Sequence, residues 1–263
     1  MKVIHVTDTH IVPAGEKLHG LDPLERLKLC FEDIATHHGD ADLCVLTGDL
    51  SDRGHTEAYI LLKELLVGLP LRTCLLLGNH DHRERFCDVF SSTPRDPNGF
   101  IQWSETTPEG ALIFLDTNAM GTDEGVYCEK RHEWLLEELA KHHSRPVYLF
   151  MHHPPFDIGI SDLDAMRLRD CDKFAQTLAH HTNVKHLFFG HVHRPISGQW
   201  CGISFSALHG TNHQVPLQLN KHPAKHGQFA YCHEEPSYGV VLINKNTTTV
   251  HMQPFLNRSS VFY

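Results

Sequence analysis

Aspartate, asparagine and histidine residues recur at five points of this chain, each directly after a stretch with the pattern of a short β-strand. The groups are Asp8-Thr9-His10, Gly48-Asp49, Gly78-Asn79-His80-Asp81, His152-His153 and Gly190-His191-Val192-His193. Ligand sites in α/β sheets assemble at the carboxyl ends of strands, so we expect these side chains to meet in one site. Carboxylate and amide oxygens combined with imidazole nitrogens, without cysteine, suit Mn, Fe, Zn or Co. The pattern therefore predicts a centre for two metal ions.

The spacing within the groups supports a shared site. In an extended segment residues i and i+2 point the same way, so both ends of Asp8-Thr9-His10 and of His191-Val192-His193 can reach one centre. Gly48, Gly78 and Gly190 each precede a candidate ligand and permit a sharp turn and close backbone approach. Each group alone is common in surface loops. Their order and separation together carry the prediction.

The chain has 24 histidines, among them four His-His pairs. His37-His38, His142-His143 and His180-His181 fall at the ends of predicted helices, where the helix dipole favours a partly protonated imidazole by about 0.3–1 kcal/mol. His152-His153 differs, because it follows a strand that Pro154-Pro155 ends at once. We therefore assign the chemistry to this last pair.

Strands and helices alternate along the chain, which predicts an α/β fold. A helix is expected after Asp22, the N-cap, with Pro23 in its first turn, and a second helix is expected after Thr56 as its cap. Further helices should end at His142-His143 and, from about Asp172, at His180-His181. Strands are expected at residues 3–7, 43–47, 72–77, 111–116, 147–151, 184–189, 199–206, 239–244 and 248–252. Residues 207–237 read as a loop rich in His, Pro and Gln.

The composition narrows the function. The net charge of −9 and the lack of a basic run argue against a partner such as long nucleic acid, which is held mainly through its phosphates. No apolar run is long enough to span a membrane, and the first residues do not resemble a signal peptide, so the expected location is cytoplasmic. The eight cysteines are scattered and include no CxxC, which favours reduced thiols; a Cys201–Cys232 link stays open.

The series DTH, GD, GNHD, HHPP and GHVH resembles the calcineurin-like metallophosphoesterase superfamily. Within it, the chain is similar to class III cyclic-nucleotide phosphodiesterases and to the bacterial glycerophosphodiesterase branch. Residues 15–20 (GEKLHG), 151–155 (MHHPP) and 212–216 (NHQVP) support that branch. The resemblance runs from Met1 to about Pro216 and then fades. It implies a four-layer αββα sandwich with two mixed β-sheets, formed by a single domain over residues 1–263. Residues 207–237 would then be a loop-rich insertion at the pocket or at an oligomer interface.

The resemblance also implies roles for individual residues. One metal would be held by Asp8, His10, Asp49 and His193, and the other by Asp49, Asn79, His152 and His191. Asp49 would bridge the two ions, and His153 would turn away from them. Asn79, His80 and His213 would face the substrate, and Asp49 and His80 are the candidate catalytic residues.

The implied reaction is hydrolysis of small phosphodiesters, either cyclic nucleotides or glycerophosphodiesters. A hydroxide that bridges the two metals would attack phosphorus, and His80 would stabilise the charge of the transition state and protonate the leaving oxygen. The expected partner is therefore a small molecule. Because the family often forms dimers, a homo-oligomer is also expected. The stretch 86–103 and residues 207–237 should shape the pocket.

Other readings stay open. Residues 48–54 (GDLSDRG) also resemble a stretch of Ser/Thr protein phosphatases, although those enzymes usually continue with GNHE and lack HHPP and GHVH. A DNA nuclease of the same superfamily would share the ligands but would need a basic surface. A non-catalytic metal-binding protein on this fold would be favoured if a ligand or His80 were missing, and none is missing.

Overall fold

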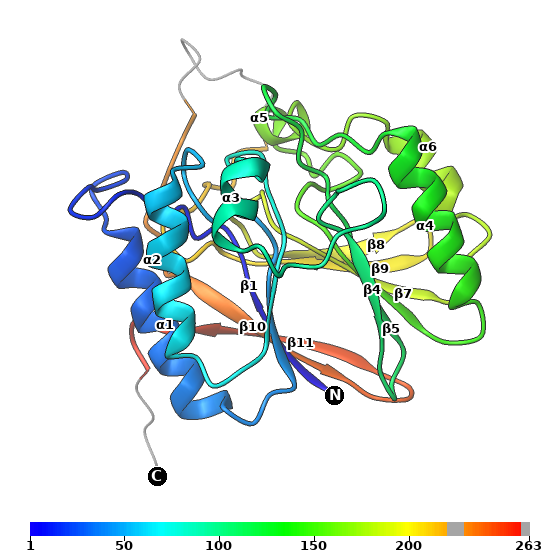
Figure 1. Ribbon diagram of the computed structural model, residues 1–263, viewed down its shortest axis with the longest axis horizontal. Helices are drawn as coiled ribbons and strands as arrows, with labels where there is room; N and C mark the ends of the chain where they lie inside the picture. The colour runs from blue at the N-terminus through cyan, green and yellow to red at the C-terminus, as the bar shows by residue number, and fades with distance from the viewer. Residues whose placement is uncertain (220–228, 259–263) are drawn as a thin grey trace.

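The computed structural model describes residues 1–219 and 229–258, which form two β-sheets packed face to face between two layers of helices (Figure 1). The first sheet has the strand order β11-β10-β1-β2-β3. β1, β2 and β3 are parallel, whereas β10 pairs antiparallel with β1 and with β11. Its strands are β1 (Lys2–Val6), β2 (Leu43–Leu46), β3 (Thr73–Leu75), β10 (Ser237–Ile243) and β11 (Thr248–Pro254).

The second sheet has the order β4-β5-β6-β7-β9-β8, with β5, β6, β7 and β9 parallel and an antiparallel strand at each edge. Both sheets are therefore mixed. The strands are β4 (Trp103–Thr106), β5 (Ala111–Phe114), β6 (Val147–Phe150), β7 (Val184–Phe189), β8 (Ile196–Trp200) and β9 (Ile203–Ala207).

Helices cover the outer face of each sheet. α1 (Pro23–His38), α2 (Thr56–Val67) and α3 (Arg83–Val89) pack on the first sheet, and α4 (Glu129–Lys141), α5 (Ser161–Asp164) and α6 (Cys171–Leu178) lie on the side of the second. α1 begins as its sequence predicts: the Asp22 side chain accepts a hydrogen bond from Glu25 N at 3.1 Å, and Pro23 occupies the first turn. No helix among the described residues is both long and apolar enough to cross a membrane.

Three apolar layers hold the four layers of structure together. Leu27, Phe31 and Ile34 of α1 pack against alternate residues of β1 and β2, and a second cluster joins α4 and α6 to the outer face of the other sheet. The third cluster fills the space between the sheets and includes stacked rings of Phe114, Phe150 and Phe188. The central strands are buried on both faces, which explains their continuous apolar runs. The predicted four-layer αββα sandwich is confirmed.

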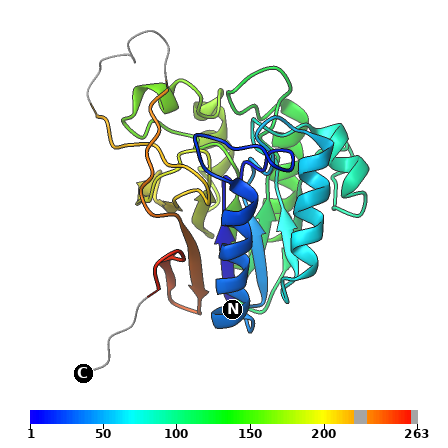
Figure 2. The ribbon, with the colours of Figure 1, turned by 90° about the vertical axis from the view of Figure 1, so that its left-hand side faces the viewer.

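The fold directs the carboxyl ends of both sheets to one end of the molecule. Figure 2 places the N-terminus, where β1 begins, at the lower end and the loop between β1 and α1 at the upper end. The parallel registers, such as Val6 beside Leu46 and Phe150 beside Phe188, bring the strand ends level. Polar groups that follow β1, β2, β3, β6 and β7 therefore collect at this end.

Some predicted elements differ from the structure. Residues 199–206 do not form one strand: Cys201 and Gly202 have φ of 50° and 81° and turn the chain between β8 and β9. Thr56 is the first residue of α2, and its N-cap is His55. β4, α3 and α5 were not predicted, because they are short and lack a clear apolar period. Within 207–237 the described parts contain no helix, and β10 begins at Ser237. Residues 220–228 lie outside the described part. All eight cysteines are free thiols.

Candidate metal centre

The backbone turns sharply at the predicted ligands. Seven non-glycine residues of the described chain have a positive φ, and five of these are predicted ligands. The left-handed backbone conformation costs about 1–3 kcal/mol at a non-glycine residue. Residues in this conformation are often found at functional sites. At these five residues the chain turns as it leaves a strand, and the polar side chain of each residue faces the shared centre. The five φ values are 53° for Asp8, 45° for His10, 49° for Asp49, 67° for His191 and 47° for His193.

Two glycines allow the loops to approach one another. Gly48 has a φ of 102°, and a Cβ there would lie 2.6 Å from His152 Nδ1. A Cβ at Gly78 would lie 2.2 Å from Asp49 Oδ1. No larger residue fits at either place while the neighbouring side chains keep their positions. The expectation that glycines precede the ligands for steric reasons is therefore met at both positions.

Four of the predicted ligands form the first group of donor atoms. One atom each from Asp8, His10, Asp49 and His193 lies within 4.8 Å of the others, and all four side chains are buried. Nε2 of His193 is 3.0 Å from Nε2 of His10 and 3.5 Å from Oδ1 of Asp8. Nε2 of His10 is 3.5 Å from Oδ2 of Asp49. These are the residues that the sequence assigned to one ion.

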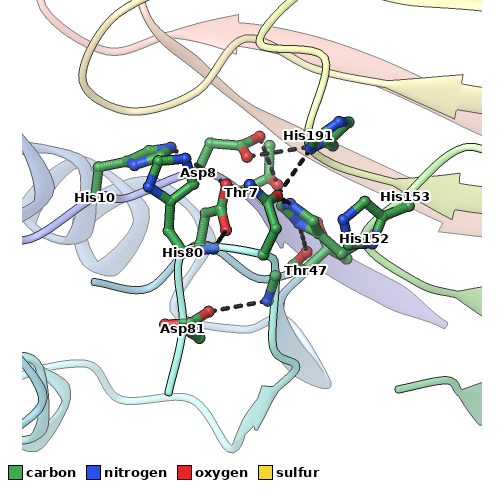
Figure 3. Close-up of polar contacts among 12 residues, drawn as sticks. Thr7, Asp8, His10, Thr47, His80, Asp81, His152, His153 and His191 are labelled. Carbon is green, nitrogen blue, oxygen red and sulfur yellow. Dashed lines mark hydrogen bonds and ion pairs between the residues drawn. The ribbon is translucent and has the colours of Figure 1, made fainter. Parts of the chain in front are cut away.

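The second group contains the remaining predicted ligands. Asn79 Oδ1 lies 3.2 Å from Nε2 of His152 and 3.0 Å from Nδ1 of His191. Figure 3 shows these two histidines near Asp8 and Thr47. Oδ2 of Asp49, which also faces His10, is 3.2 Å from Nε2 of His152. One carboxylate oxygen therefore lies between the two groups. This is the place that a bridging ligand would need.

Hydrogen bonds decide which atoms of two histidines face the centre. Nδ1 of His152 lies 2.7 Å from the carbonyl of Thr47, and Nδ1 of His193 lies 2.8 Å from the carbonyl of His213. A carbonyl only accepts, so Nδ1 donates in both rings, and Nε2 of each neutral ring carries a lone pair. These lone pairs face the carboxylates of Asp49 and Asp8, and acceptors that face acceptors need a cation between them, either a proton or a metal ion. The residues thus fit a metal centre.

The electrostatics lead to the same conclusion. Burial disfavours the charged ring of His152. The charge of Asp49, the hydrogen bond to Asp49 and the charge of Asp8 together outweigh burial and raise the pKa of His152 to about 9. The pKa of Asp49 lies well below its usual range, because His152, His80 and His10 together outweigh its burial. Burial lowers the pKa of His193 to about 4, so this ring stays neutral. The pocket around Asp49 therefore favours positive charge, and a metal ion can supply it.

His80 adjoins the centre and faces the solvent. Its backbone N–H donates to Asp49 Oδ1 at 2.9 Å, and its ring Nδ1 donates to the carbonyl of Asp52 at 2.7 Å. The ring is 39% exposed and lines the same cavity as the ligands, so Nε2 is free to meet a bound molecule. The Asp52 carboxylate lies 3.4 Å from Nδ1 of His10 and 3.7 Å from Nδ1 of His80. Asp52 was not among the predicted site residues.

His153 is fully buried beside the second group. Its Nδ1 lies 2.7 Å from the hydroxyl of Thr117, and its ring packs 4.7 Å from the ring of His191. One ring nitrogen each of His152, His153 and His191 also lies within 4.8 Å of the others. By distance alone, His153 competes with Asn79 for the second ion. Thr117 engages only Nδ1, and the buried Nε2 has no hydrogen-bond partner among the described residues, so the choice of Asn79 over His153 stays a prediction.

Asp81 holds two of the loops together, a role that sequence reasoning did not assign. Its carboxylate accepts hydrogen bonds from the backbone N–H groups of Leu50, Ser51 and Gly78 at 2.9–3.1 Å and from Tyr59 Oη at 2.9 Å. Burial and the charge of Asp49 raise its pKa to about 6, although the backbone donors oppose this. The last residue of GNHD thereby ties the loop after β2 to the loop after β3.

Five of the seven predicted ligands line a cavity of about 260 Å³: His10, Asp49, Asn79, His191 and His193. His213 is buried in its wall, with its ring 4.4 Å from the ring of His193 and 5.0 Å from that of His10. Residues 207–237 contribute His213, Val215, Phe229 and Tyr231 to the lining, as expected for this segment. The stretch 86–103 does not line this cavity, so that prediction is wrong. Its residues Phe90 and Trp103 line a separate hollow beside β3.

Most other residues of the lining carry no sequence signal. Leu163, Met166, Phe229 and Tyr231 reach the cavity from segments without a motif. Apolar and aromatic residues of this kind are as frequent in cores and on surfaces as in pockets. Only the fold reveals them as part of the site. His19 is different, because it belongs to the GEKLHG stretch in the loop between β1 and α1.

Comparisons with known proteins agree with this geometry. The family model described as calcineurin-like phosphoesterase matches residues 1–195. The chain is 38% identical over its full length to 95% of a probable cyclic nucleotide phosphodiesterase of Rhodopseudomonas palustris. It is 32% identical, over 84% of its length and 82% of the relative, to a probable glycerophosphodiester phosphodiesterase of Arcobacter nitrofigilis. A dimetal phosphatase from Danio rerio has the same fold, with a TM-score of 0.73, 13% identity and coverage of 97% and 96% of the two chains.

Proposed function

The chain belongs to the calcineurin-like phosphoesterase family, and from this premise we propose that it is a metal-dependent phosphodiesterase that hydrolyses small phosphodiesters. One observation carries the proposal. Oδ2 of Asp49 lies between Nε2 of His10 and Nε2 of His152, at 3.5 Å and 3.2 Å, where it can bridge two cations. Relatives named as cyclic nucleotide and glycerophosphodiester phosphodiesterases support the same reaction class.

The proposed ligands follow from the two groups of donor atoms. Asp8, His10 and His193 would hold one ion, and Asn79, His152 and His191 the other, with Asp49 shared. Nitrogen and oxygen donors without sulfur suit Mn, Fe, Zn or Co. Two such ions, when bound, lower the pKa of a coordinated water and draw charge from the phosphoryl oxygens of the substrate.

The chain's own side chains orient the substrate and stabilise the transition state. Nε2 of His80 is free to meet a phosphoryl or leaving oxygen, because the Asp52 carbonyl holds the other ring nitrogen. A protonated His80 can donate to the oxygen on which charge develops. His213 lies across the cavity and is kept neutral, because burial and the neighbouring histidines lower its pKa. It is proposed to contact the substrate.

Among the described residues, the side chains of the cavity offer no permanent cation for the additional charge of a monoester. Within residues 1–219 and 229–258, no lysine or arginine lines the cavity, whereas Asp49, Asp52 and Asp123 do. A diester carries one negative charge at neutral pH and a monoester about two, so only the two proposed metal ions could balance the second charge of a monoester. Arg53 of GDLSDRG, which would favour a phosphatase, has an 80% exposed side chain and lies outside the lining. The diesterase is therefore preferred to the protein phosphatase.

The nuclease and the non-catalytic protein are weaker alternatives. The negative net charge opposes binding of long nucleic acid, and a cavity of about 260 Å³ suits a small molecule. A binding protein without activity would not need a free His80 beside a complete set of ligands. A homo-oligomer and a cytoplasmic location remain expectations from the sequence.

The test is the initial rate on a panel of substrates after reconstitution with Mn²⁺. The panel contains bis(p-nitrophenyl) phosphate, p-nitrophenyl phosphate, 3′,5′-cyclic AMP, 2′,3′-cyclic AMP and glycerophosphocholine. We expect every rate on a diester to depend on metal and the preferred diester to exceed the monoester by more than tenfold. Turnover of the monoester alone would favour the phosphatase over the diesterase. A metal-loaded protein that turns over nothing would support the non-catalytic alternative.

A further inference from the structure

Four aromatic rings cluster at the mouth of the cavity, apart from the proposed ligands. They belong to His19, His213, Phe229 and Tyr231, and we call them the aromatic rim. The rings of His19 and Tyr231 stack with centroids 3.7 Å apart and planes at 28°. Tyr231 also lies edge-on to His213, at 4.9 Å and 85°, and 5.4 Å from Phe229. Through His213 the rim reaches His193 of the metal centre, at 4.4 Å.

Backbone contacts hold the rim in place from two sides. Gln214 and Cys232 exchange a pair of backbone hydrogen bonds, both at 2.9 Å, which hold Tyr231 beside His213. Nε2 of His233 lies 3.2 Å from the carbonyl of His19. The segments around His19, Gln214 and Cys232 therefore meet at the rim. Tyr231 nevertheless remains 44% exposed, which leaves much of it free for a ligand.

The rest of the wall near the rim is apolar. Leu163, Met166 and Val215 line the same cavity, and among the described residues its one carboxylate remote from the metal centre is that of the exposed Asp123. A wall of rings and aliphatic side chains offers little to a hydrated glycerol or sugar. It suits a flat ring that loses water when it binds. Stacking of one base on an aromatic side chain contributes about 1–3 kcal/mol and does not depend strongly on which base is bound.

We propose that the aromatic rim binds the purine or pyrimidine base of a cyclic nucleotide, with Tyr231 as the stacking residue. This inference rests on the phosphodiesterase function proposed above and names its substrate class. The phosphodiester lies against the metal-binding groups and His80, and the base lies against Tyr231. Glycerophosphodiesters can react at the same centre, but they have no ring for the rim to bind.

The test compares Tyr231→Ala and Tyr231→Phe with the wild-type protein on two diesters. The first is 3′,5′-cyclic AMP, and the second is glycerophosphoglycerol, which has no ring and no cationic group. Tyr231→Ala should lower the ratio of kcat/KM for cyclic AMP to that for glycerophosphoglycerol by about 5- to 100-fold, the range for loss of one base stack. The loss should fall mainly on KM, and Tyr231→Phe should keep the wild-type ratio. Leu136→Ala, at an exposed residue of α4, is the matched control.

Other outcomes separate this inference from the proposed function. Equal losses on both diesters would overturn the stacking role and leave the phosphodiesterase standing. Glycerophosphocholine, measured as a third diester, tests a cation–π site: a larger loss on it than on cyclic AMP would also overturn the stacking role. Calorimetry with the hydrolysis-resistant phosphorothioate of cyclic AMP supplies a readout without turnover. If the protein hydrolyses no diester but binds this analogue, and Tyr231→Ala weakens the binding, the base site holds and the proposed reaction is wrong.

Discussion

Nε2 of His152 lies 3.2 Å from Oδ2 of Asp49, and the Thr47 carbonyl fixes which nitrogen of the ring faces that oxygen. The same oxygen faces Nε2 of His10 at 3.5 Å. The two proposed ions would thus share Asp49, and each histidine would belong to one ion. This relationship lets single substitutions distinguish the two halves of the centre.

The His152-His153 pair tests which member binds metal. His152→Ala should leave about one ion per chain, because it removes a lone pair that faces Asp49. His153→Ala should keep two, because Asp49, Asn79, His152 and His191 make up the second group without it. Metal content after dialysis, measured by plasma emission spectroscopy, shows which of the two histidines is the ligand. The reverse result would mean that His153 is the ligand.

Asn79 provides an independent test of the second group. Its Oδ1 lies 3.0 Å from His191 and 3.2 Å from His152, so Asn79→Ala should weaken the second ion and lower kcat/KM by about 100-fold or more. Asn98→Ala, in an exposed turn, is the matched control. Near-normal turnover in Asn79→Ala would contradict the assignment.

His80 should affect the rate and not the metal content. Its ring reaches the cavity without taking part in either group of ligands, so His80→Ala should bind two ions and lower kcat by about 100- to 1,000-fold. The measurement is kcat with saturating cyclic AMP, with metal content determined on the same sample. A loss of one ion together with a lower kcat would show that His80 affects the rate through the structure of the metal centre.

Asp81 should matter for stability. Asp81→Ala leaves three backbone donors and the Tyr59 hydroxyl without their buried acceptor, so the free energy of unfolding should fall by about 3 kcal/mol or more. Urea unfolding with excess chelator removes the contribution of metal binding. Asp88→Ala, at an exposed residue of α3, should change little. An equally small change in Asp81→Ala would show that the two loops do not depend on this carboxylate.

Acid should destabilise the fold through histidines buried between the sheets. Burial lowers the pKa of His5 to about 3 and that of His186 to about 4. The folded state thus favours neutral rings, and this stability is present above the unfolded pKa of about 6.5 and is lost as the pH falls toward these values. Between pH 7.5 and pH 5, each of these two histidines should lower the free energy of unfolding by about 2 kcal/mol.

Urea unfolding at the two pH values, with chelator present, measures this loss. His5→Gln removes one titrating ring. Between the two pH values its free energy of unfolding should therefore change by about 2 kcal/mol less than that of the wild type. His251→Gln, at an exposed residue of β11, is the control. An unchanged pH dependence in His5→Gln would mean that His5 does not titrate on unfolding.

The sequence alone was enough to predict the kind of centre and its candidate residues. Ligand groups such as Asp8-Thr9-His10 and His191-Val192-His193 are local, because a strand end and a two-residue spacing set where both side chains point. The start of α1 was equally local, because an Asp22 N-cap and a Pro23 need only their own neighbours. Short elements such as β4 and α3 could not be predicted, since the other sheet and helices stabilise them more than their own sequence does.

Only the tertiary structure decided the relations between distant residues. The place of Asp49 Oδ2 between His10 and His152 depends on how two sheets pack, and no spacing along the chain encodes it. The contact of His153 with Thr117 and the ties that Asp81 makes arise in the same way. The stack of His19 on Tyr231 joins residues more than two hundred positions apart, and Tyr231 lies in no motif. Long-range packing sets such contacts, so the chemistry could be predicted from the sequence, whereas the shape of the substrate pocket could not.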